Sequence, residues 1–115
     1  MITIDKRSPI PVYKQIMLQI KKEMLFGRLS KGEQLKPVRE LAETLDVNQN
    51  TVLKAYERLA MENTIYSEHG VGYFVGDADN SSIDFNEFTR IILKLKNQGM
   101  ERDLIMMLVQ EVWKE

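Results

Sequence analysis

Residues 35–59 read LKPVRELAETLDVNQNTVLKAYERL and contain two short helical patterns with a corner between them. Each pattern places apolar residues at i, i+3, i+4 and i+7, the spacing of one face of an amphipathic helix. The first pattern is Val38, Leu41, Ala42 and Leu45, and the second is Val52, Ala55, Tyr56 and Leu59. Pro37 suits the start of the first helix, and Asn48 suits the N-cap of the second. The stretch therefore predicts two short helices joined by a tight turn at Asp46 and Val47, with Tyr56 in the core.

A longer amphipathic pattern precedes this stretch, between residues 8 and 27. Ile16, Ile20 and Met24 recur at intervals of four, flanked by Tyr13 and Met17. The prolines at positions 9 and 11 favour a helix start because the missing N–H is not needed there, and the glycine at position 27 favours a stop. Residues 28–36 then form a polar connection in this prediction. Three helices in a row, of which the last two are joined by a tight turn, indicate a helix-turn-helix whose final helix enters the major groove of DNA.

The period changes after the third predicted helix, which ends near Asn63. The segments TIYS (residues 64–67) and GYFV (residues 72–75) are rich in β-branched and aromatic residues and are separated by EHGV. Such a pattern predicts a β-hairpin. A hairpin directly behind a helix-turn-helix is the wing of a winged-helix domain, so the predicted domain covers residues 1–76.

The rest of the chain is a small polar segment followed by two apolar helical patterns. We expect residues 77–82 to be a linker and residues 83–115 to be a two-helix tail. The apolar positions of this tail are too many for two helices to bury between themselves, so a matching surface on a second copy is predicted, giving a homodimer. The residues expected to form this dimer contact are Phe88, Ile92, Leu95, Leu104, Leu108, Val112 and Trp113. The predicted fold class is mainly α with a small β-hairpin wing, namely a winged helix-turn-helix plus a C-terminal helical dimerisation hairpin.

Composition narrows the possible classes of protein. The chain has 115 residues, 16 basic and 17 acidic side chains and no cysteine, so disulfides and thiolate metal sites are excluded. Its longest apolar run, residues 104–109, is far too short for a membrane helix, and we expect a cytoplasmic protein. The net charge of −1 is not spread evenly. Residues 1–76 carry 11 basic and 9 acidic side chains, whereas residues 77–115 carry 5 and 8, so a weakly basic domain precedes an acidic tail.

The stretch at residues 35–59 resembles the DNA-binding region of GntR-type transcriptional regulators, written L-P-S-x-R-x-L-A, then G-V-S-R-x-T-V and A-Y. The similarity extends back through PVYKQI at residues 11–16 and forward through HGVGYFV at residues 69–75. ITID at residues 2–5 and the short tail resemble the YtrA subfamily, whose members lack the large effector domains of their relatives. This resemblance implies a sequence-specific repressor that binds a pseudo-palindromic operator of double-stranded DNA as a homodimer.

The sequence departs from the family pattern at two positions that usually carry DNA-facing arginines. Gln49 replaces the Arg of S-R-x-T, and Leu53 replaces the Arg that commonly follows T-V. Arginine favours guanine, whereas glutamine and asparagine pair with adenine. The replacement at position 49 therefore predicts a shift of base preference towards adenine.

Candidate DNA contacts follow from helix ends and from the resemblance. Residues in the first turn of the third helix reach base edges, the start of the second helix suits phosphate or base-edge contacts, and lysines nearby suit phosphates. The wing tip matches the family's glycine and histidine, which approach the backbone and the minor groove. The candidates are Lys36, Arg39, Asn48, Gln49, Asn50, Thr51, Lys54, His69 and Gly70. For each polar side chain the alternative is an ordinary solvated surface residue, and for Asn48 it is a helix cap alone.

The sequence gives less support to other classes of protein. One histidine, no cysteine and no glycine-rich phosphate loop or metal-ligand spacing leave little basis for an enzyme, a metal or a cofactor. The main rival is a winged-helix module for protein–protein interaction with only weak, non-specific DNA binding, because two recognition-helix cations are absent. An unknown small-molecule effector is compatible with the sequence and would bind at the dimer interface or between the two parts of the chain.

Overall fold

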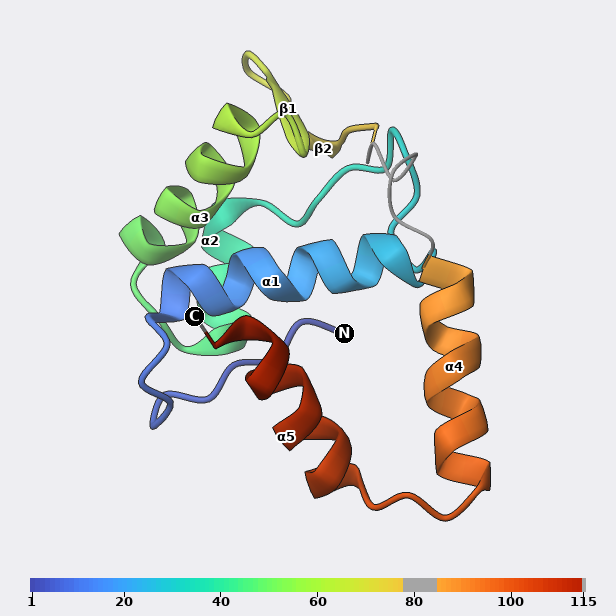
Figure 1. Ribbon diagram of the computed structural model, residues 1–115. Helices are drawn as coiled ribbons and strands as arrows, with labels where there is room; N and C mark the ends of the chain where they lie inside the picture. The colour runs from blue at the N-terminus through green and yellow to red at the C-terminus, as the bar shows by residue number, and fades with distance from the viewer. Residues whose placement is uncertain (78–84, 115) are drawn as a thin grey trace. The chain divides into compact units, whose positions relative to one another are not determined.

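The computed structural model describes residues 1–77 and 85–114, and the chain divides into two compact units, Met1–Ala78 and Asp79–Glu115 (Figure 1). The first unit is referred to below as the head and the second as the tail. Of the predicted linker at residues 77–82, the structure describes only Asp77. Residues 83, 84 and 115 of the predicted tail also lie outside the described residues. The prediction of a mainly α chain with one hairpin is confirmed by the element order α1-α2-α3-β1-β2-α4-α5.

Helix α1, Val12–Leu25, is the longest helix described in the head. It begins directly after Pro11, and the chain leaves it through Gly27, whose φ of +74° suits a residue without a Cβ. The N–H of Arg28 donates to the carbonyl of Glu23 at 2.9 Å, which closes the last turn. Both predicted ends of this helix are confirmed.

The helix-turn-helix consists of α2, Val38–Leu45, and α3, Gln49–Met61. Between them Asp46 adopts the left-handed conformation (φ 54°, ψ 55°), and Asn63 does the same (φ 62°) just after α3. Asp and Asn tolerate this conformation better than other non-glycine residues. Asp46 therefore makes the turn at which the quoted family pattern has glycine, and Asn63 makes the turn that follows α3.

The wing is an antiparallel pair of strands, β1, Ile65–Glu68, and β2, Gly72–Val75. In Figure 1 the hairpin follows directly from the end of α3. The prediction that residues 28–36 form only a polar connection was incomplete. The N–H of Leu35 donates to the carbonyl of Tyr73, and the N–H of Val75 donates to the carbonyl of Glu33, each at 2.9 Å. This connection therefore pairs with β2 and, with Leu35 buried, closes one side of the core.

The core of the head joins the inner faces of α1, α2 and α3 to the base of the hairpin. Its buried apolar residues are Ile16, Met17, Ile20, Met24, Leu35, Leu41, Ala42, Val52, Ala55, Tyr56, Leu59, Ile65 and Val75. All the apolar positions at which the sequence predicts the inner face of α3 are among them. Burial of each large apolar side chain stabilises the fold by about 1.5–3 kcal/mol, so α3 is held firmly on the rest of the head.

Tyr56 is the largest side chain that the core fully buries, and its core assignment is confirmed. Its hydroxyl donates to the carbonyl of Lys36 at 2.7 Å, and its ring meets Tyr73 edge-on at 5.0 Å between centres. Burial, with the nearby Glu40 charge, raises the pKa of Tyr56, so the hydroxyl stays a hydrogen-bond donor. Tyr56 thereby ties α3 to the segment that leads into α2.

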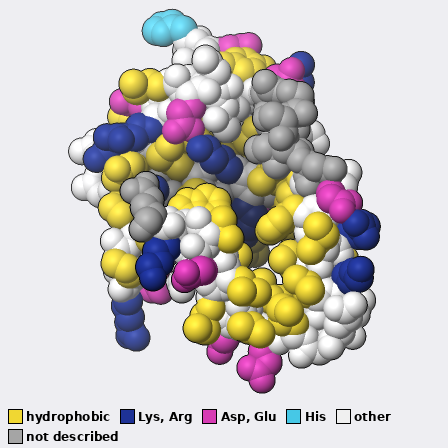
Figure 2. All heavy atoms as spheres, viewed as in Figure 1, with side chains coloured by type: hydrophobic (Ala, Val, Ile, Leu, Met, Phe, Trp, Pro, Cys, Tyr) yellow, Lys and Arg dark blue, Asp and Glu magenta, His cyan; other side chains and the backbone are white. Residues whose placement is uncertain are grey.

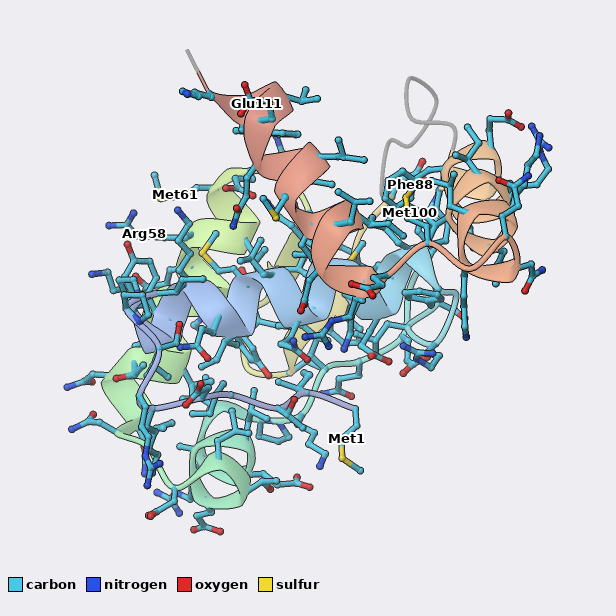
Figure 3. All side chains as sticks on the ribbon, turned by 60° about the horizontal axis from the view of Figure 1, so that its bottom comes forward. Met1, Arg58, Met61, Phe88, Met100 and Glu111 are labelled. Atoms are coloured by element: carbon cyan, nitrogen blue, oxygen red, sulfur yellow. The ribbon has the colours of Figure 1, made fainter. Side chains whose placement is uncertain are left out.

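Glu23 is the buried charged residue of the head, 3% exposed. Both of its carboxylate oxygens accept hydrogen bonds from Arg28, at 2.7 and 3.1 Å, and the Met1 amino group lies 3.1 Å away. Figure 3 shows Met1 on the segment that passes along α1. The hydrogen bonds from Arg28 lower the pKa of Glu23 to about 2, against the opposing effect of burial.

Replacement of Glu23 by Gln should make the stability of the head less dependent on pH. Because the pKa of Glu23 is lower in the folded protein than in the unfolded chain, where it is about 4.3, the ionised carboxylate stabilises the fold at any pH above that value. This stabilisation is lost as the pH falls towards 2. Glu23→Gln should therefore melt at a lower temperature than the unmodified protein at pH 7, and the difference should shrink between pH 4.5 and pH 2. Thermal unfolding followed by circular dichroism measures it, and a difference independent of pH would contradict this role.

The tail contains α4, Phe85–Asn97, and α5, Arg102–Trp113, as its apolar patterns predict. Gly99, with φ +89°, lies in the turn between them. No residue of either helix is buried within the chain. Among the described residues, none of the helices in head or tail is both long and apolar enough to cross a bilayer.

Candidate nucleic-acid interface

The turn between α2 and α3 fixes where the predicted recognition helix begins. The Asn48 side-chain oxygen accepts a hydrogen bond from the N–H of Asn50 at 2.7 Å, so its role as N-cap is confirmed. The Val47 N–H donates to the carbonyl of Ala42, and the Lys6 ammonium donates to the carbonyl of Asp46 at 2.6 Å. The N-terminal segment therefore braces this corner from outside.

The predicted contact residues of α3 lie away from its buried face. Gln49, Asn50 and Lys54 are exposed, and Thr51 is half-buried. The side chains of Gln49 and Asn50 form no hydrogen bond with any described residue, so their amide donors and acceptors are available to a ligand. The first turn of α3 thus presents polar side chains on a helix whose opposite face is locked into the core.

The other predicted contacts lie at the start of α2 and on the wing. Arg39 is exposed and its guanidinium has no partner among the residues that the structure describes. Lys36 is exposed, while its carbonyl is held by Tyr56. His69 is exposed at the tip of the hairpin, where Figure 2 shows its ring standing clear of neighbouring side chains.

Glycines shape the tip of the wing. Gly70 has φ +75° and Gly72 has φ +144°, and both values disfavour residues with a Cβ. Gln34 donates from its side-chain amide to the carbonyl of Val71 at 3.1 Å, which braces the hairpin against the connection between α1 and α2. The predicted pair His69 and Gly70 is therefore presented at the outer end of a braced turn.

Ion pairing divides the cations of the head into two groups. Lys21, Lys22, Arg28 and Lys31, together with Lys6, each pair with a carboxylate. Within residues 1–77 and 85–114, no ion pair is formed by Arg7, Lys14, Lys36, Arg39, Lys54 or Arg58. These uncompensated cations lie near the start of α1, near the start of α2 and along α3. Positive charge that is not neutralised internally is what the phosphates of DNA require.

Tyr13 and Arg58 lie beside Lys54, and the sequence did not predict either of them as part of the interface. The Lys54 ammonium lies 4.1 Å, and the Arg58 guanidinium carbon 4.9 Å, from the centre of the Tyr13 ring. Arg58 is exposed and follows Lys54 by one helical turn. That spacing is visible in the sequence, but the approach of Tyr13 depends on how α1 packs against α3.

A cavity of about 730 Å³ lies within the head, between the N-terminal segment, the end of α1, and α2. Its walls include the apolar side chains Ile2, Ile4, Leu35, Leu41 and Leu45. Its polar lining includes Tyr56 and the Glu23–Arg28 pair. Within the described residues, no group of three or more His, Asp and Glu side chains is arranged to hold a metal ion.

The predicted dimer residues of the tail are present as solvent-facing apolar groups. Phe88 is 57% exposed and Trp113 is 80% exposed. Leu104, Leu108 and Val112 are also exposed, while Ile92 and Leu95 are half-buried. The tail therefore carries a large apolar surface that its own fold does not cover.

Comparison with known proteins assigns the head to a family. Residues 12–75 match the family described as bacterial regulatory proteins, gntR family. The chain is 38% identical over 96 residues to the HTH-type transcriptional repressor YtrA of Bacillus subtilis (strain 168), covering 84% of this chain and 74% of that protein.

Solved structures show the same relationship. YtrA from Sulfolobus acidocaldarius, a GntR-family transcription factor, is 36% identical and superposes with a TM-score of 0.64 over 84% of this chain and 97% of its own. The DNA-binding domain of AraR in complex with operator ORX1 is 25% identical, with a TM-score of 0.58 over 64% of this chain and 90% of its own. The helix-turn-helix, its wing and the matched residues together show that this chain belongs to the GntR family of bacterial regulatory proteins.

Proposed function

We propose that the protein is a homodimeric transcriptional repressor whose two heads bind a two-fold-symmetric DNA operator. The observation that carries the proposal is the division of cations in the head. Lys6 and the cations of residues 21–31 are paired with carboxylates, whereas the cations of α3, those at the start of α2, and Arg7 and Lys14 form no ion pair with described residues. Relatives named as repressors and a similar domain bound to an operator support this role.

In this proposal α3 lies in the major groove of the DNA, and the surrounding elements of the head contact the sugar-phosphate backbone. Gln49 and Asn50 read base edges, since their side-chain amides can each pair with adenine through two hydrogen bonds. Asn48 keeps its capping bond, and its amide N–H groups reach the same region. Thr51, Lys54, Lys36 and Arg39 contact phosphates, and His69 with Gly70 carries the wing to the neighbouring groove.

The tail supplies the dimer contact in this proposal. Exposed apolar side chains on α4 and α5 form a surface of the kind that monomeric soluble proteins rarely leave open. A second copy covers it with the same residues, because a two-fold interface uses one patch on both chains. Two heads on one dimer then match the two half-sites of a palindromic operator.

A small-molecule effector would have room in the cavity of the head rather than only at the dimer interface. Its volume of about 730 Å³ falls within the range of ligand pockets. Its lining includes residues of α2 and the tyrosine of α3 that holds Lys36. A ligand there would touch both helices of the helix-turn-helix.

Replacement of Arg39 by Ala should weaken operator binding without unfolding the head. Because the guanidinium has no partner among described residues, its removal should leave the melting temperature nearly unchanged. Loss of its proposed DNA contact should cost roughly 1–3 kcal/mol of binding free energy, or about 5- to 150-fold in Kd. Gln49→Ala should act in the same direction, by loss of a base contact. Fluorescence anisotropy on a selected duplex, with melting temperatures, makes the test.

Lys31→Ala is the matched control for Arg39→Ala. It also removes one cation from the head, but Lys31 pairs with Asp77 and lies outside the proposed interface. If Arg39→Ala loses as much free energy of unfolding as free energy of DNA binding, Arg39 stabilises the fold and is not a DNA contact. Equal affinity of the unmodified protein for all duplexes, combined with tight binding to another protein, would instead favour the protein-interaction module.

A further inference from the structure

Two cationic side chains of α3, Lys54 and Arg58, contact the ring of Tyr13 on α1. Lys54 Nζ lies 4.1 Å from the ring centre, and Arg58 Cζ lies 4.9 Å from it. In Figure 3 Arg58 lies on α3 beside the N-terminal end of α1. The face of an aromatic ring attracts a cation electrostatically within about 6 Å, so contact with Tyr13 favours conformations that keep both side chains beside its ring.

Among the residues that the structure describes, neither Lys54 nor Arg58 has a carboxylate partner that accounts for its position. Like charges four residues apart on a helix repel each other, yet neither forms an ion pair with the residues that the structure describes. By contrast, Lys21 of α1 reaches Glu62 at the end of α3, at 2.8 Å. The contact between these helices thus has one end that is neutralised and one end, at Tyr13, that carries two uncompensated positive charges.

The position of this pair on α3 identifies the anion that it suits. Thr51, Lys54 and Arg58 follow one another at i, i+3 and i+7 and therefore share one edge of the helix. This edge borders the buried face of α3, to which Ala55 and Leu59 belong, and Gln49 and Asn50 precede it in the first turn. When a helix lies in the major groove its tip faces the bases, and its flanks face the sugar-phosphate walls.

We propose that Lys54 and Arg58, held by the ring of Tyr13, form a binding site for one phosphodiester group of the operator backbone. Lys54 and Arg58 are the ligands, and Tyr13 is a positioning residue that acts through the face of its ring. The site rests on the proposed function, because the phosphodiester belongs to the bound duplex. It fixes how deeply α3 enters the groove and carries no sequence information of its own.

Binding to duplex DNA at several salt concentrations tests this site. The probes are a fluorescein-labelled duplex of random sequence and a duplex recovered by selection. Lys54→Gln and Arg58→Gln should each raise Kd on both probes by roughly 3- to 10-fold and reduce the slope of log K against log salt by about 0.9. Lys21→Gln, which removes a neutralised cation from the same pair of helices, should leave the slope unchanged.

Variants of Tyr13 separate positioning from a structural role. Tyr13→Leu should raise Kd by roughly 2- to 5-fold, the effect of losing an exposed cation–π contact, whereas Tyr13→Phe keeps the ring and should bind like the unmodified protein. In a Lys54→Gln/Arg58→Gln background, Tyr13→Leu should cause no further loss. A further loss there, or a weakened Tyr13→Phe, would overturn the assignment of the ring.

The outcome also distinguishes this site from the proposed function. If no duplex is preferred but the Lys54 and Arg58 variants lower the salt slope on the random probe, the phosphodiester site stands and sequence-specific repression fails. If a symmetric duplex is preferred but Arg58→Gln behaves as Lys21→Gln does, the proposed function stands and the site is wrong.

Discussion

Leu108→Glu should convert the protein from a dimer to a monomer and lower its affinity for a symmetric operator by at least about 100-fold. Leu108 is exposed on α5, within the apolar surface that we propose a second copy covers. At the centre of such a contact, an unpaired carboxylate loses its hydration without gaining a partner. Because two linked heads bind two half-sites with a high effective concentration, separation of the chains removes this advantage.

Sedimentation and operator binding measured on the same samples check this result. Gln110→Glu is the matched control, because it adds the same charge to an exposed polar position of α5. Trp113→Ala should loosen the dimer to a smaller extent, since it removes a large side chain that is 80% exposed in the single chain. Unchanged sedimentation of both Leu108→Glu and Trp113→Ala would refute the tail as the dimer contact.

Gln49→Arg should change the preferred base at one operator position from adenine to guanine. Gln49 is exposed at the first position of α3 and its amide is not engaged by described residues. A bidentate amide–adenine pair or a bidentate arginine–guanine pair discriminates against the wrong base by about 1–3 kcal/mol, equivalent to roughly 5- to 150-fold. The substitution should therefore exchange one preference for the other and leave the rest of the operator unchanged.

Selection of duplexes by the two proteins in parallel measures this change. Leu53→Arg serves as a control, because it adds the same charge to α3 at a position that is half-buried. That variant should strengthen binding to all duplexes through phosphates without the same change of base. If Gln49→Arg and the unmodified protein select identical sequences, Gln49 is not a base-reading residue.

Local rules were sufficient to predict most of the head. The apolar spacing in residues 35–59 specifies two helices, and the residues at their ends specify the turns. Asn48 caps α3, and Asp46 and Asn63 adopt left-handed conformations. Each of these features depends on residues within a few positions of one another, which is why the sequence alone can reveal them.

Features that depend on packing between distant segments could not be predicted. The segment at residues 32–35 pairs with β2 because the fold brings them together, and its own sequence is too polar and too short to indicate a strand. In the same way, Tyr13 reads as one more residue of the α1 face until α3 is placed against it. The buried Glu23 is likewise explained only by Arg28 and the N-terminal segment around it.

The structure shows which positive charges of the head are neutralised by ion pairs, and the composition alone does not. Counting residues gives the first 76 positions a small positive excess, which alone says little about DNA. Ion pairs neutralise the cations of residues 21–31 and leave those around α3 uncompensated, so the charge available to phosphates is concentrated near the predicted contact residues. Lys and Arg side chains are visible along the edge of the head where α3 lies (Figure 2).

We expect the two heads of a dimer to read one symmetric DNA site. Selection of the 115-residue chain against a library of random duplexes at low salt, followed by footprinting of the recovered sequence, tests this expectation. We predict one preferred site with two-fold symmetry, half-sites about one helical turn or a multiple of it apart, and adenine opposite Gln49. Recovery of no preferred sequence, or of a single half-site bound by one chain, would contradict the claim.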